Sequence, residues 1–196
     1  MKYDPQIHHR RSIRLKGYDY SQAGAYFITI CCQDRACLFG KIADGRMVLN
    51  DAGKIANECW LQIPEHFPKV ILHEHIVMPN HVHGIIELDS TVTVGVQNDA
   101  GDVGVQDFEP LRGQNFEPQR RRQNEFQKII PRSIGSIIRG YKIGVTKWFR
   151  NNTEIQIVWQ RNYYEHILRN ERSYQIISNY IIDNPAKWNA DKFFIL

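Results

Sequence analysis

Residues 70–88 read VILHEHIVMPNHVHGIIEL, a stretch that contains two candidate β-strands. The runs 70–78 and 81–88 are rich in β-branched residues, and each has the length and composition of a β-strand. Pro79 and Asn80 between them favour a tight turn or a bulge. The sequence therefore predicts two neighbouring strands that meet at this turn.

The second run begins with two histidines one residue apart, His81 and His83. Because residues i and i+2 of a strand point to the same side, the two imidazoles should converge while Val82 points into the core. Two converging imidazoles can supply two ligands to a metal ion. The alternative is two half-exposed surface histidines. The preceding pair, His73 and His75, is interpreted as surface or supporting histidines that could flank the same site.

The residues before this stretch predict a strand, a hairpin and a helix. Residues 25–32, AYFITICC, are rich in β-branched and aromatic side chains, which favours a strand. Asp44-Gly45 lies between two short apolar runs and predicts a hairpin turn. Apolar residues then recur every four positions after Asp51, which can cap a helix. That helix should end at or shortly after Pro64.

The last third of the chain predicts two helices with an extended segment between them. The apolar face of the first helix comprises Ile134, Ile137, Ile138, Tyr141, Val145 and Trp148. Residues 157–168, IVWQRNYYEHIL, favour a strand or an irregular extended segment. The second helix should run from near Asn170 to Asp183, because Pro185 disfavours helical geometry at Asn184.

Residues 89–130 differ from the rest of the chain. They contain short imperfect repeats, such as QDFEP at 106–110 and QNFEP at 114–118, without a helix or strand period. We therefore predict a single domain interrupted by an extended, mobile insertion. Charge also changes sign here: residues 87–118 carry a net charge of −6, and residues 119–150 carry +8.

The composition limits the class of protein. A length of 196 residues suits one domain, and 42% hydrophobic residues indicate a globular chain. The net charge of +4 suits a polyanionic partner without proving one. The four cysteines form no CxxC pair, so we interpret them as reduced thiols of a cytoplasmic protein. Neither a signal peptide nor a membrane-spanning run is recognisable.

A second candidate functional group lies in the last helix, where Tyr180 precedes Asn184 by four residues. Residues i and i+4 share a helix face, so the hydroxyl and the amide should lie side by side. The alternative is a tyrosine that only packs in the core. Tyrosine is a weak nucleophile at neutral pH because its pKa is about 10. Two histidines with a neutral oxygen ligand suit Mg²⁺ or Mn²⁺, which could help such a hydroxyl attack a phosphodiester.

Three segments together resemble a known family. MPNHVHGIIEL, IVWQRNYYEHILRNE and NYIIDNPAKW resemble the IS200-like tyrosine transposases, and specifically the REP-associated tyrosine transposase branch. The resemblance covers roughly residues 15–88 and 131–190 and leaves out the insertion. It implies an α+β, ferredoxin-like antiparallel sheet with helices on one face, of the HUH single-tyrosine nuclease type.

The resemblance also implies an activity. A divalent metal, Mg²⁺ or Mn²⁺, would be held by His81, His83 and Asn184, and Tyr180 would be the nucleophile. Such enzymes cleave and rejoin single-stranded DNA near REP-like hairpins through a 5′-phosphotyrosine and release a 3′-hydroxyl. They act as monomers or homodimers. Tyr174 is a weaker nucleophile candidate.

Other residues of the region stay without an assigned reaction step. Tyr163 and Tyr164 are expected to pack or to stack on bases. Glu165 and His166 match the family, and a structural role is favoured for them.

Phosphate contacts are expected from an N-terminal basic arm and from the basic segment that follows the insertion. The candidate residues are Arg10, Arg11, Arg14, Arg120, Arg121, Arg122, Arg139, Lys142 and Lys147. An ordinary core helix with a solvated basic side would also explain the last three. Two other functions stay open: a non-catalytic nucleic-acid-binding protein on the same fold, and a metal-dependent phosphoesterase that activates water and forms no covalent intermediate.

Overall fold

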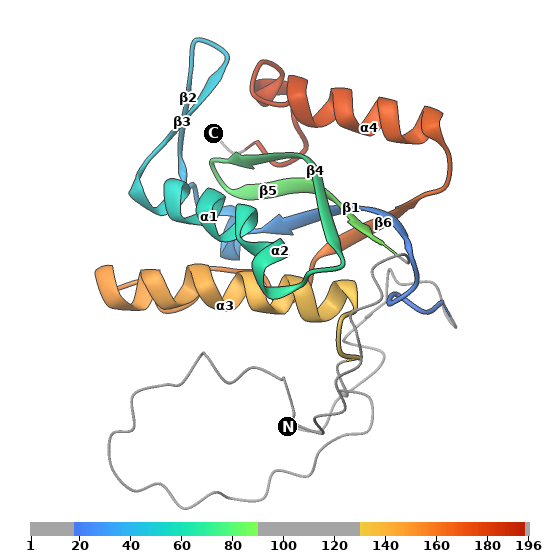
Figure 1. Ribbon diagram of the computed structural model, residues 1–196. Coiled ribbons are helices and arrows are strands. Elements are labelled where there is room, and N and C mark those ends of the chain that lie inside the picture. Colours follow the sequence, from blue (N-terminus) through green and yellow to red (C-terminus); the bar gives the residue numbers. More distant parts are fainter. Residues whose placement is uncertain (1–17, 90–129, 195–196) are drawn as a thin grey trace, which may run out of the picture.

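The computed structural model describes residues 18–89 and 130–194 (Figure 1). Its centre is a four-stranded antiparallel sheet with the strand order β4-β5-β1-β6. The strands are β1 (Gly24–Cys31), β4 (Val70–Met78), β5 (His81–Leu88) and β6 (Tyr164–Leu168). With a helix after β1 and another after β5, this order is the ferredoxin-like arrangement.

The two strands predicted from residues 70–88 are present as β4 and β5, joined at Pro79-Asn80. Along β5 the side chains alternate, so Val82 and Ile86 join the main core and Ile85 joins a separate cluster. His81 and His83 lie at the start of this central strand, opposite Cys31 and Thr29 of β1. A register shift interrupts the β4–β5 pairing between Leu72 and His75.

Two helices, α1 (Asp51–Leu61) and α3 (Ile134–Asn152), cover one face of the sheet (Figure 1). Gly84 of β5 lets Trp60 approach closely, because a Cβ atom there would lie 2.2 Å from the indole ring. A short helix, α2 (Ile63–His66), follows α1 and contains Pro64. The cap of α1 is Asn50, which accepts a hydrogen bond from the Gly53 amide, so the prediction of Asp51 as the cap is wrong.

The last helix, α4 (Glu171–Asp183), packs on the opposite face of the sheet (Figure 1). It starts where the sequence predicted, near Asn170, and this residue is its cap and accepts a hydrogen bond from the Ser173 amide. Ile181 of α4 packs there against Ile85 and Leu168. The α+β fold with an antiparallel sheet is therefore confirmed, while the finer expectation of helices on one face needs correction because α4 covers the other face.

The smaller elements follow local sequence signals. The predicted hairpin around Asp44-Gly45 is confirmed as β2 (Gly40–Ala43) and β3 (Arg46–Leu49), and both turn residues have positive φ angles. Of the extended segment predicted at 157–168, only the last five residues form a regular strand, β6. Trp159, earlier in the segment, forms an isolated bridge with Cys32.

Two regions singled out in the sequence lie wholly or almost wholly outside the described residues. They are the N-terminal basic arm and the insertion predicted at 89–130, of which only the two end residues are described. None of the helices in the described residues is both long enough and apolar enough to cross a bilayer.

Candidate active site

His81 and His83 face α4 from the start of β5, and both side chains are fully buried. Their ring centroids are 4.4 Å apart. The predicted convergence of the two imidazoles is therefore present, and the alternative of half-exposed surface histidines is wrong. Val82 between them is buried in the core on the other face, as predicted.

One nitrogen of each ring is fixed by a neighbouring side chain. His81 Nδ1 lies 2.8 Å from the amide oxygen of Asn80. That oxygen can only accept, so Nδ1 carries the proton and the lone pair of His81 lies on Nε2. His81 Nε2 is buried and has no hydrogen-bond partner among the described residues. A buried nitrogen lone pair without a partner is what a metal ligand presents before it binds an ion.

His83 Nδ1 is held 2.8 Å from the Thr29 hydroxyl, so its Nε2 also points into the site. A hydroxyl can both donate and accept, and Thr29 can therefore hold either neutral tautomer of His83. Burial lowers the pKa of His81 to about 4, with Lys192 adding to the shift and Asp191 opposing it. Burial and the neighbouring His81 hold the pKa of His83 well below its ordinary value. Both rings are therefore neutral at pH 7, the form that binds metals.

Tyr180 of α4 reaches this histidine pair directly. Its hydroxyl lies 3.2 Å from His83 Nε2 and donates to Asp191 Oδ2 over 3.1 Å. Burial, the charge of Asp191 and the hydrogen bond to it raise the pKa of Tyr180 to about 12. The phenol is thus protonated at neutral pH, with a carboxylate oxygen next to its proton.

Asn184 is buried one helical turn after Tyr180, as its spacing predicted. Its amide nitrogen donates to Asp191 Oδ2 over 2.9 Å, and its Oδ1 atom is buried without a hydrogen-bond partner among the described residues. The structure therefore brings together all four of the predicted residues of the histidine–tyrosine group: His81, His83, Tyr180 and Asn184.

Asp191 is the residue of this site that the sequence did not reveal. Ligand atoms of His81, His83 and Asp191 all lie within 4.8 Å of one another. Asp191 follows the short 3₁₀ helix η3 (Trp188–Ala190), in a segment without helix or strand periodicity. A single carboxylate in such a segment gives no spacing signal, so only the folded chain identifies it.

The donor set fits a hard divalent cation. It contains two neutral imidazole nitrogens and one carboxylate, and one of these atoms, His81 Nε2, has no other partner in the described residues. The Asn184 Oδ1 atom is also buried without a partner there, but the amide nitrogen of Asn184 is the atom that faces Asp191. Such mixed nitrogen and oxygen ligands suit Mn²⁺, and Mg²⁺ through the oxygens. We refer to His81, His83, Tyr180, Asn184 and Asp191 as the HHYND cluster.

Aromatic rings close the outer side of the cluster. Phe193 and Trp188 lie 4.6 Å and 5.9 Å from the His81 ring, measured between ring centroids. Both side chains are nearly fully buried. They lower the polarity around the ligands and thereby strengthen electrostatic interactions inside the cluster.

The preceding histidine pair does not join the cluster. His73 contacts Glu87 and Tyr174, and His75 contacts Asn57 and stacks on Trp60. The interpretation of these histidines as surface or supporting residues fits their contacts, and neither flanks the HHYND cluster. On β6, Glu165 and His166 pair with Ile28 and Phe27 of β1, and no chemical role follows from this placement.

The described candidates for phosphate contacts lie on α3, behind the sheet from the cluster. Arg139 and Lys147 are exposed there. The ammonium group of Lys142 donates to the backbone oxygens of Gln160 and Asn162, so it is engaged within the protein. Burial lowers the pKa of Lys142 to about 8. The remaining candidates, Arg10, Arg11, Arg14, Arg120, Arg121 and Arg122, lie outside the described residues.

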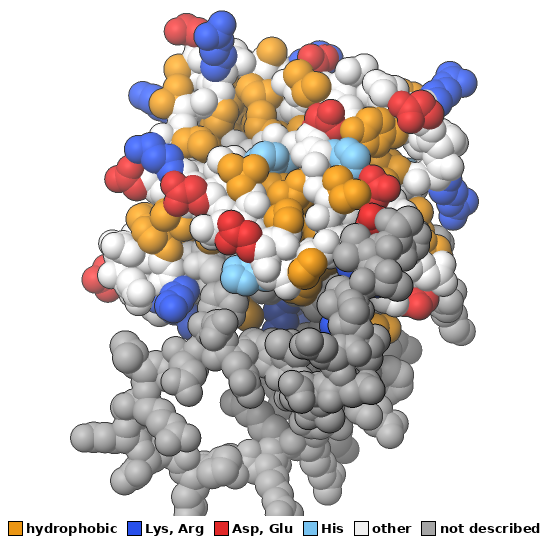
Figure 2. Space-filling model, viewed as in Figure 1, with side chains coloured by type: hydrophobic (Ala, Val, Ile, Leu, Met, Phe, Trp, Pro, Cys, Tyr) orange, Lys and Arg blue, Asp and Glu red, His pale blue; other side chains and the backbone are white. Residues whose placement is uncertain are grey.

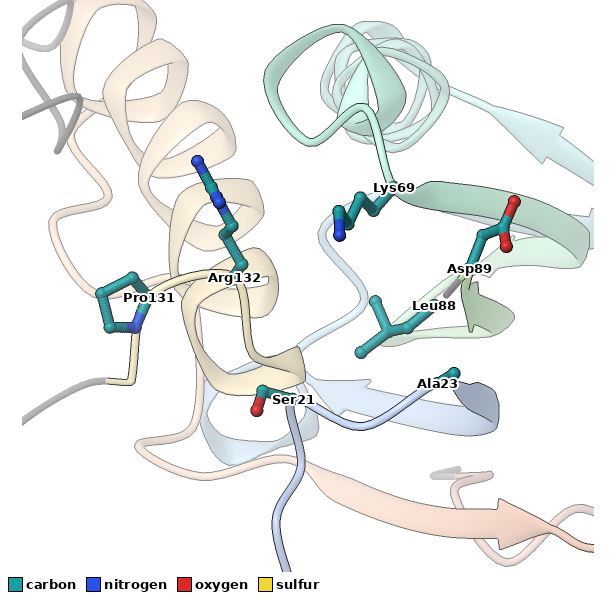
Figure 3. A pocket seen from close by; sticks show the side chains of 7 residues that line it. All are labelled: Ser21, Ala23, Lys69, Leu88, Asp89, Pro131 and Arg132. Atoms are coloured by element: carbon teal, nitrogen blue, oxygen red, sulfur yellow. The ribbon is translucent and has the colours of Figure 1, made fainter. Parts of the chain in front are cut away.

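The surface shown in Figure 2 and a cavity at the far end of β5 give no indication of a second reactive centre. Figure 2 shows positive and negative side chains interspersed on the viewed face, without a continuous basic stripe. A cavity of about 360 Å³ is lined by residues including Lys69, Leu88 and Arg132 (Figure 3). Leu88 ends β5 whereas His81 begins it, so this cavity lies at the opposite end of the strand from the HHYND cluster.

Comparisons with known proteins give one close relative and one shared fold. No family model matches the chain. An uncharacterized protein of Haemophilus influenzae is 46% identical over 195 residues, which cover 99% of this chain and 98% of that protein. The solved structure of a REP-associated tyrosine transposase bound to a REP hairpin overlays with a TM-score of 0.55 at 18% identity, over 91% of this chain and 76% of that one. This overlay establishes a shared fold.

Proposed function

We propose a catalytic function for this chain, which belongs to the same protein family as the uncharacterized Haemophilus influenzae protein. The chain is a metal-dependent endonuclease and strand transferase for single-stranded DNA, of the transposase type, with Tyr180 as its nucleophile. One observation carries the proposal. The Tyr180 hydroxyl lies 3.2 Å from one imidazole of a buried histidine pair and 3.1 Å from a carboxylate.

Three residues of the site would act as metal ligands, and two further residues orient the imidazole rings. His81, His83 and Asp191 would hold the divalent metal, with the amide oxygen of Asn184 as a fourth candidate ligand. When bound, the metal would polarise a non-bridging oxygen of the scissile phosphate and stabilise the charge that develops on it. Asn80 and Thr29 hold the imidazole rings in place from behind, as partners of metal-binding histidines commonly do.

Tyr180 supplies the covalent step. Its oxygen attacks phosphorus, and the bond from phosphorus to the 3′ oxygen of the preceding nucleotide breaks. The leaving oxygen takes a proton from water, so a 5′-phosphotyrosine and a 3′-hydroxyl result. Asp191 Oδ2 accepts the hydrogen bond of the Tyr180 hydroxyl and is placed to take its proton. The covalent bond conserves the energy of the phosphodiester for rejoining the strand.

The hydrogen bond between Tyr180 and His83 must open before both groups can act. Because Tyr180 donates its only proton to Asp191, its oxygen accepts from His83 Nε2 in this arrangement. For Nε2 to become a ligand, the ring proton has to move to Nδ1, where the Thr29 hydroxyl can accept it. His83 would hold the metal only in the tautomer that leaves Nε2 without a proton, and in that tautomer it no longer donates to the Tyr180 hydroxyl.

The proposed substrate is single-stranded DNA next to a hairpin, with REP-like hairpins as the first choice. Two observations support this substrate: the shared fold with a transposase that was solved bound to a REP hairpin, and the sequence resemblance around His81 and Tyr180. The basic residues of α3, Arg139 and Lys147, would add phosphate contacts that depend on salt but not on sequence.

A cleavage assay tests the proposal. A labelled single-stranded hairpin oligonucleotide is incubated with the full chain and Mn²⁺, and the products are separated on a denaturing gel. We expect cleavage together with a protein–DNA adduct, and loss of both products in excess chelator. Cleavage without an adduct would favour the phosphoesterase alternative. Binding without cleavage would favour the non-catalytic alternative.

A further inference from the structure

Two cationic side chains, Arg35 and Lys192, lie at the outer edge of the HHYND cluster. The Arg35 guanidinium carbon is 5.8 Å and the Lys192 ammonium nitrogen 4.8 Å from the centroid of the Phe193 ring. The Phe193 ring in turn lies 4.6 Å from the His81 ring. Both positive charges are thus separated from the histidine pair by one aromatic side chain.

The backbone brings Arg35 to this edge through a strained turn. Asp34 and Arg35 have φ angles of 53° and 55°, a left-handed conformation that is unfavourable for residues other than glycine. The turn belongs to η1 (Gln33–Arg35), which follows β1 where Cys31 pairs with His81. The Gln33 amide anchors it by donating to the Val158 carbonyl over 2.8 Å.

Arg35 is also bonded to the segment that carries Lys192. Its Nη1 donates to the backbone oxygen of Lys192 over 3.2 Å, which holds the guanidinium group beside that segment. This bond uses one of the five N–H donors of the guanidinium group, and no hydrogen bond from the other four is found within the described residues. The charge of Lys192 reaches the histidine pair, since it contributes to lowering the pKa of both His81 and His83.

Neither cation is neutralised by an ion pair in the described part of the chain. The lysines Lys54 and Lys187, in contrast, contact Asp51 and Asp183 at 2.9 Å and 2.8 Å. Asp34 precedes Arg35 in the turn and accepts a hydrogen bond from the Gln33 side chain, and in the described residues neither it nor Asp191 forms an ion pair with the two cations. An unpaired positive edge next to metal ligands favours an anionic ligand with more than one charged group.

We propose that Arg35 and Lys192 form a phosphate-binding site for the phosphodiester next to the one that Tyr180 attacks. The proposal rests on the function proposed above and identifies the residues that would orient its substrate. The planar fork of a guanidinium group binds two phosphate oxygens at once, while an ammonium group acts as a point charge. Their fixed position beside Phe193 would set the distance between the bound phosphate and the HHYND cluster, and hence which bond is cut.

Binding without cleavage is the first test. Affinity of a fluorescent single-stranded hairpin oligonucleotide is measured by anisotropy in chelator, over a series of salt concentrations, for the wild type, Arg35→Ala, Lys192→Ala and the matched control Lys54→Ala. We expect each of the first two variants to bind about 5- to 20-fold more weakly at low salt. The slope of log affinity against log salt should fall by about 0.7 for each lost phosphate contact. Lys54→Ala should match the wild type.

A second measurement excludes an indirect effect of a disturbed turn. The same oligonucleotide is prepared with one neutral methylphosphonate in place of each phosphate in turn. In the wild type, the replacement next to the cleavage position should weaken binding by a similar factor. In Arg35→Ala, that replacement should have no further effect, because the contact is already absent. Arg35→Lys, which keeps the charge without the fork, should fall between the wild type and Arg35→Ala.

The outcomes separate this inference from the proposed function. Unchanged salt slopes in both variants, or a methylphosphonate effect that persists in Arg35→Ala, would overturn the phosphate site even if the wild type cleaves DNA. If instead the wild type never cleaves in Mn²⁺ but the variants lose the expected contact, the endonuclease proposal fails and the phosphate site stands.

Discussion

Two tyrosines of α4 each contact a histidine and a carboxylate, yet only one of them lies beside side chains that could hold a metal ion. Tyr180 contacts His83 Nε2 and Asp191 Oδ2 at 3.2 Å and 3.1 Å. Tyr174 contacts His73 Nδ1 at 3.1 Å and donates to Glu74 Oε2 over 2.9 Å. A phenol, an imidazole and a carboxylate therefore meet twice on one helix.

The difference lies in what each histidine does with the rest of its contacts. Both ring nitrogens of His73 are engaged, because its Nε2 lies 2.7 Å from Glu87 Oε2. His83 instead lies beside His81, whose Nε2 is buried without a partner among the described residues. A hydrogen-bonded tyrosine is thus common to both regions, and an unused ligand atom is found at only one of them. The Tyr174 group holds α4 against β4, where Ser178 also donates to Glu74.

The largest contrast is expected from removing the two hydroxyls. Tyr180→Phe should abolish the covalent adduct and reduce cleavage by about a thousandfold or more, because among the described residues Tyr180 alone places a phenol at the ligands. Tyr174→Phe should keep at least about half of the cleavage activity, since it loses only a structural hydrogen bond. Adduct yield on a denaturing gel measures both. Equal losses in the two variants would remove the distinction between the tyrosines.

The histidines provide the next contrast. His81→Ala should lower cleavage about a hundredfold and weaken Mn²⁺ binding at least about tenfold, because it removes a proposed ligand. His73→Ala should leave Mn²⁺ affinity unchanged, since both of its nitrogens already have partners. Isothermal titration with Mn²⁺ checks the prediction. If the affinity for Mn²⁺ drops in His73→Ala but not in His81→Ala, the metal binds at His73 and not in the HHYND cluster.

Asp191 should influence both the metal and the nucleophile. Asp191→Asn should weaken Mn²⁺ binding about tenfold, because an amide is a poorer ligand than a carboxylate. It should also lower the pKa of Tyr180 from about 12 towards 10, leaving the part of the shift that is due to burial. Ultraviolet titration, with Tyr180→Phe to assign the signal, follows the phenol. A Tyr180 pKa that stays unchanged in Asp191→Asn would contradict the hydrogen bond between them.

The smallest effect concerns stability as a function of pH. The pKa of His81 is about 4 in the folded chain, against an ordinary value near 6.5, so the unfolded chain binds the extra proton between these values. The free energy of unfolding should therefore decrease as the pH falls from 6.5 to 4, by on the order of 2–3 kcal/mol, and should not depend on His81 above 6.5. Denaturant titration of the metal-free chain should show a weaker decrease in His81→Gln, whereas exposed His166→Gln should follow the wild type. Identical pH profiles for the wild type and His81→Gln would contradict the neutral buried imidazole.

Local sequence patterns were sufficient for much of this site. The spacing of His81 and His83 on a strand predicted that the two imidazoles converge, and the spacing of Tyr180 and Asn184 at the end of a helix predicted that their side chains lie on one face. Both follow from short-range geometry. The turn at Asp44-Gly45 followed equally from its two residues.

The features that could not be predicted from the sequence depend on tertiary structure. Asp191 joins the cluster only because the segment after α4 folds back over the sheet, which no local period encodes. The cap of α1 moved from Asp51 to Asn50 because both residue types can cap a helix and only the backbone geometry distinguishes them. Lys142 was expected to contact phosphate, but the carbonyl groups of Gln160 and Asn162 are its partners.

Locating the covalent bond between protein and DNA tests most directly whether Tyr180 is the nucleophile. After reaction with single-stranded hairpin DNA and Mn²⁺, nuclease and trypsin treatment should leave a nucleotide on the peptide of residues 173–187, SYQIISNYIIDNPAK, which contains both Tyr174 and Tyr180. Fragmentation of this peptide in the mass spectrometer assigns the modified residue. We expect the phosphonucleotide on Tyr180. A phosphonucleotide on Tyr174, or cleaved DNA with no modified tyrosine, would contradict this expectation.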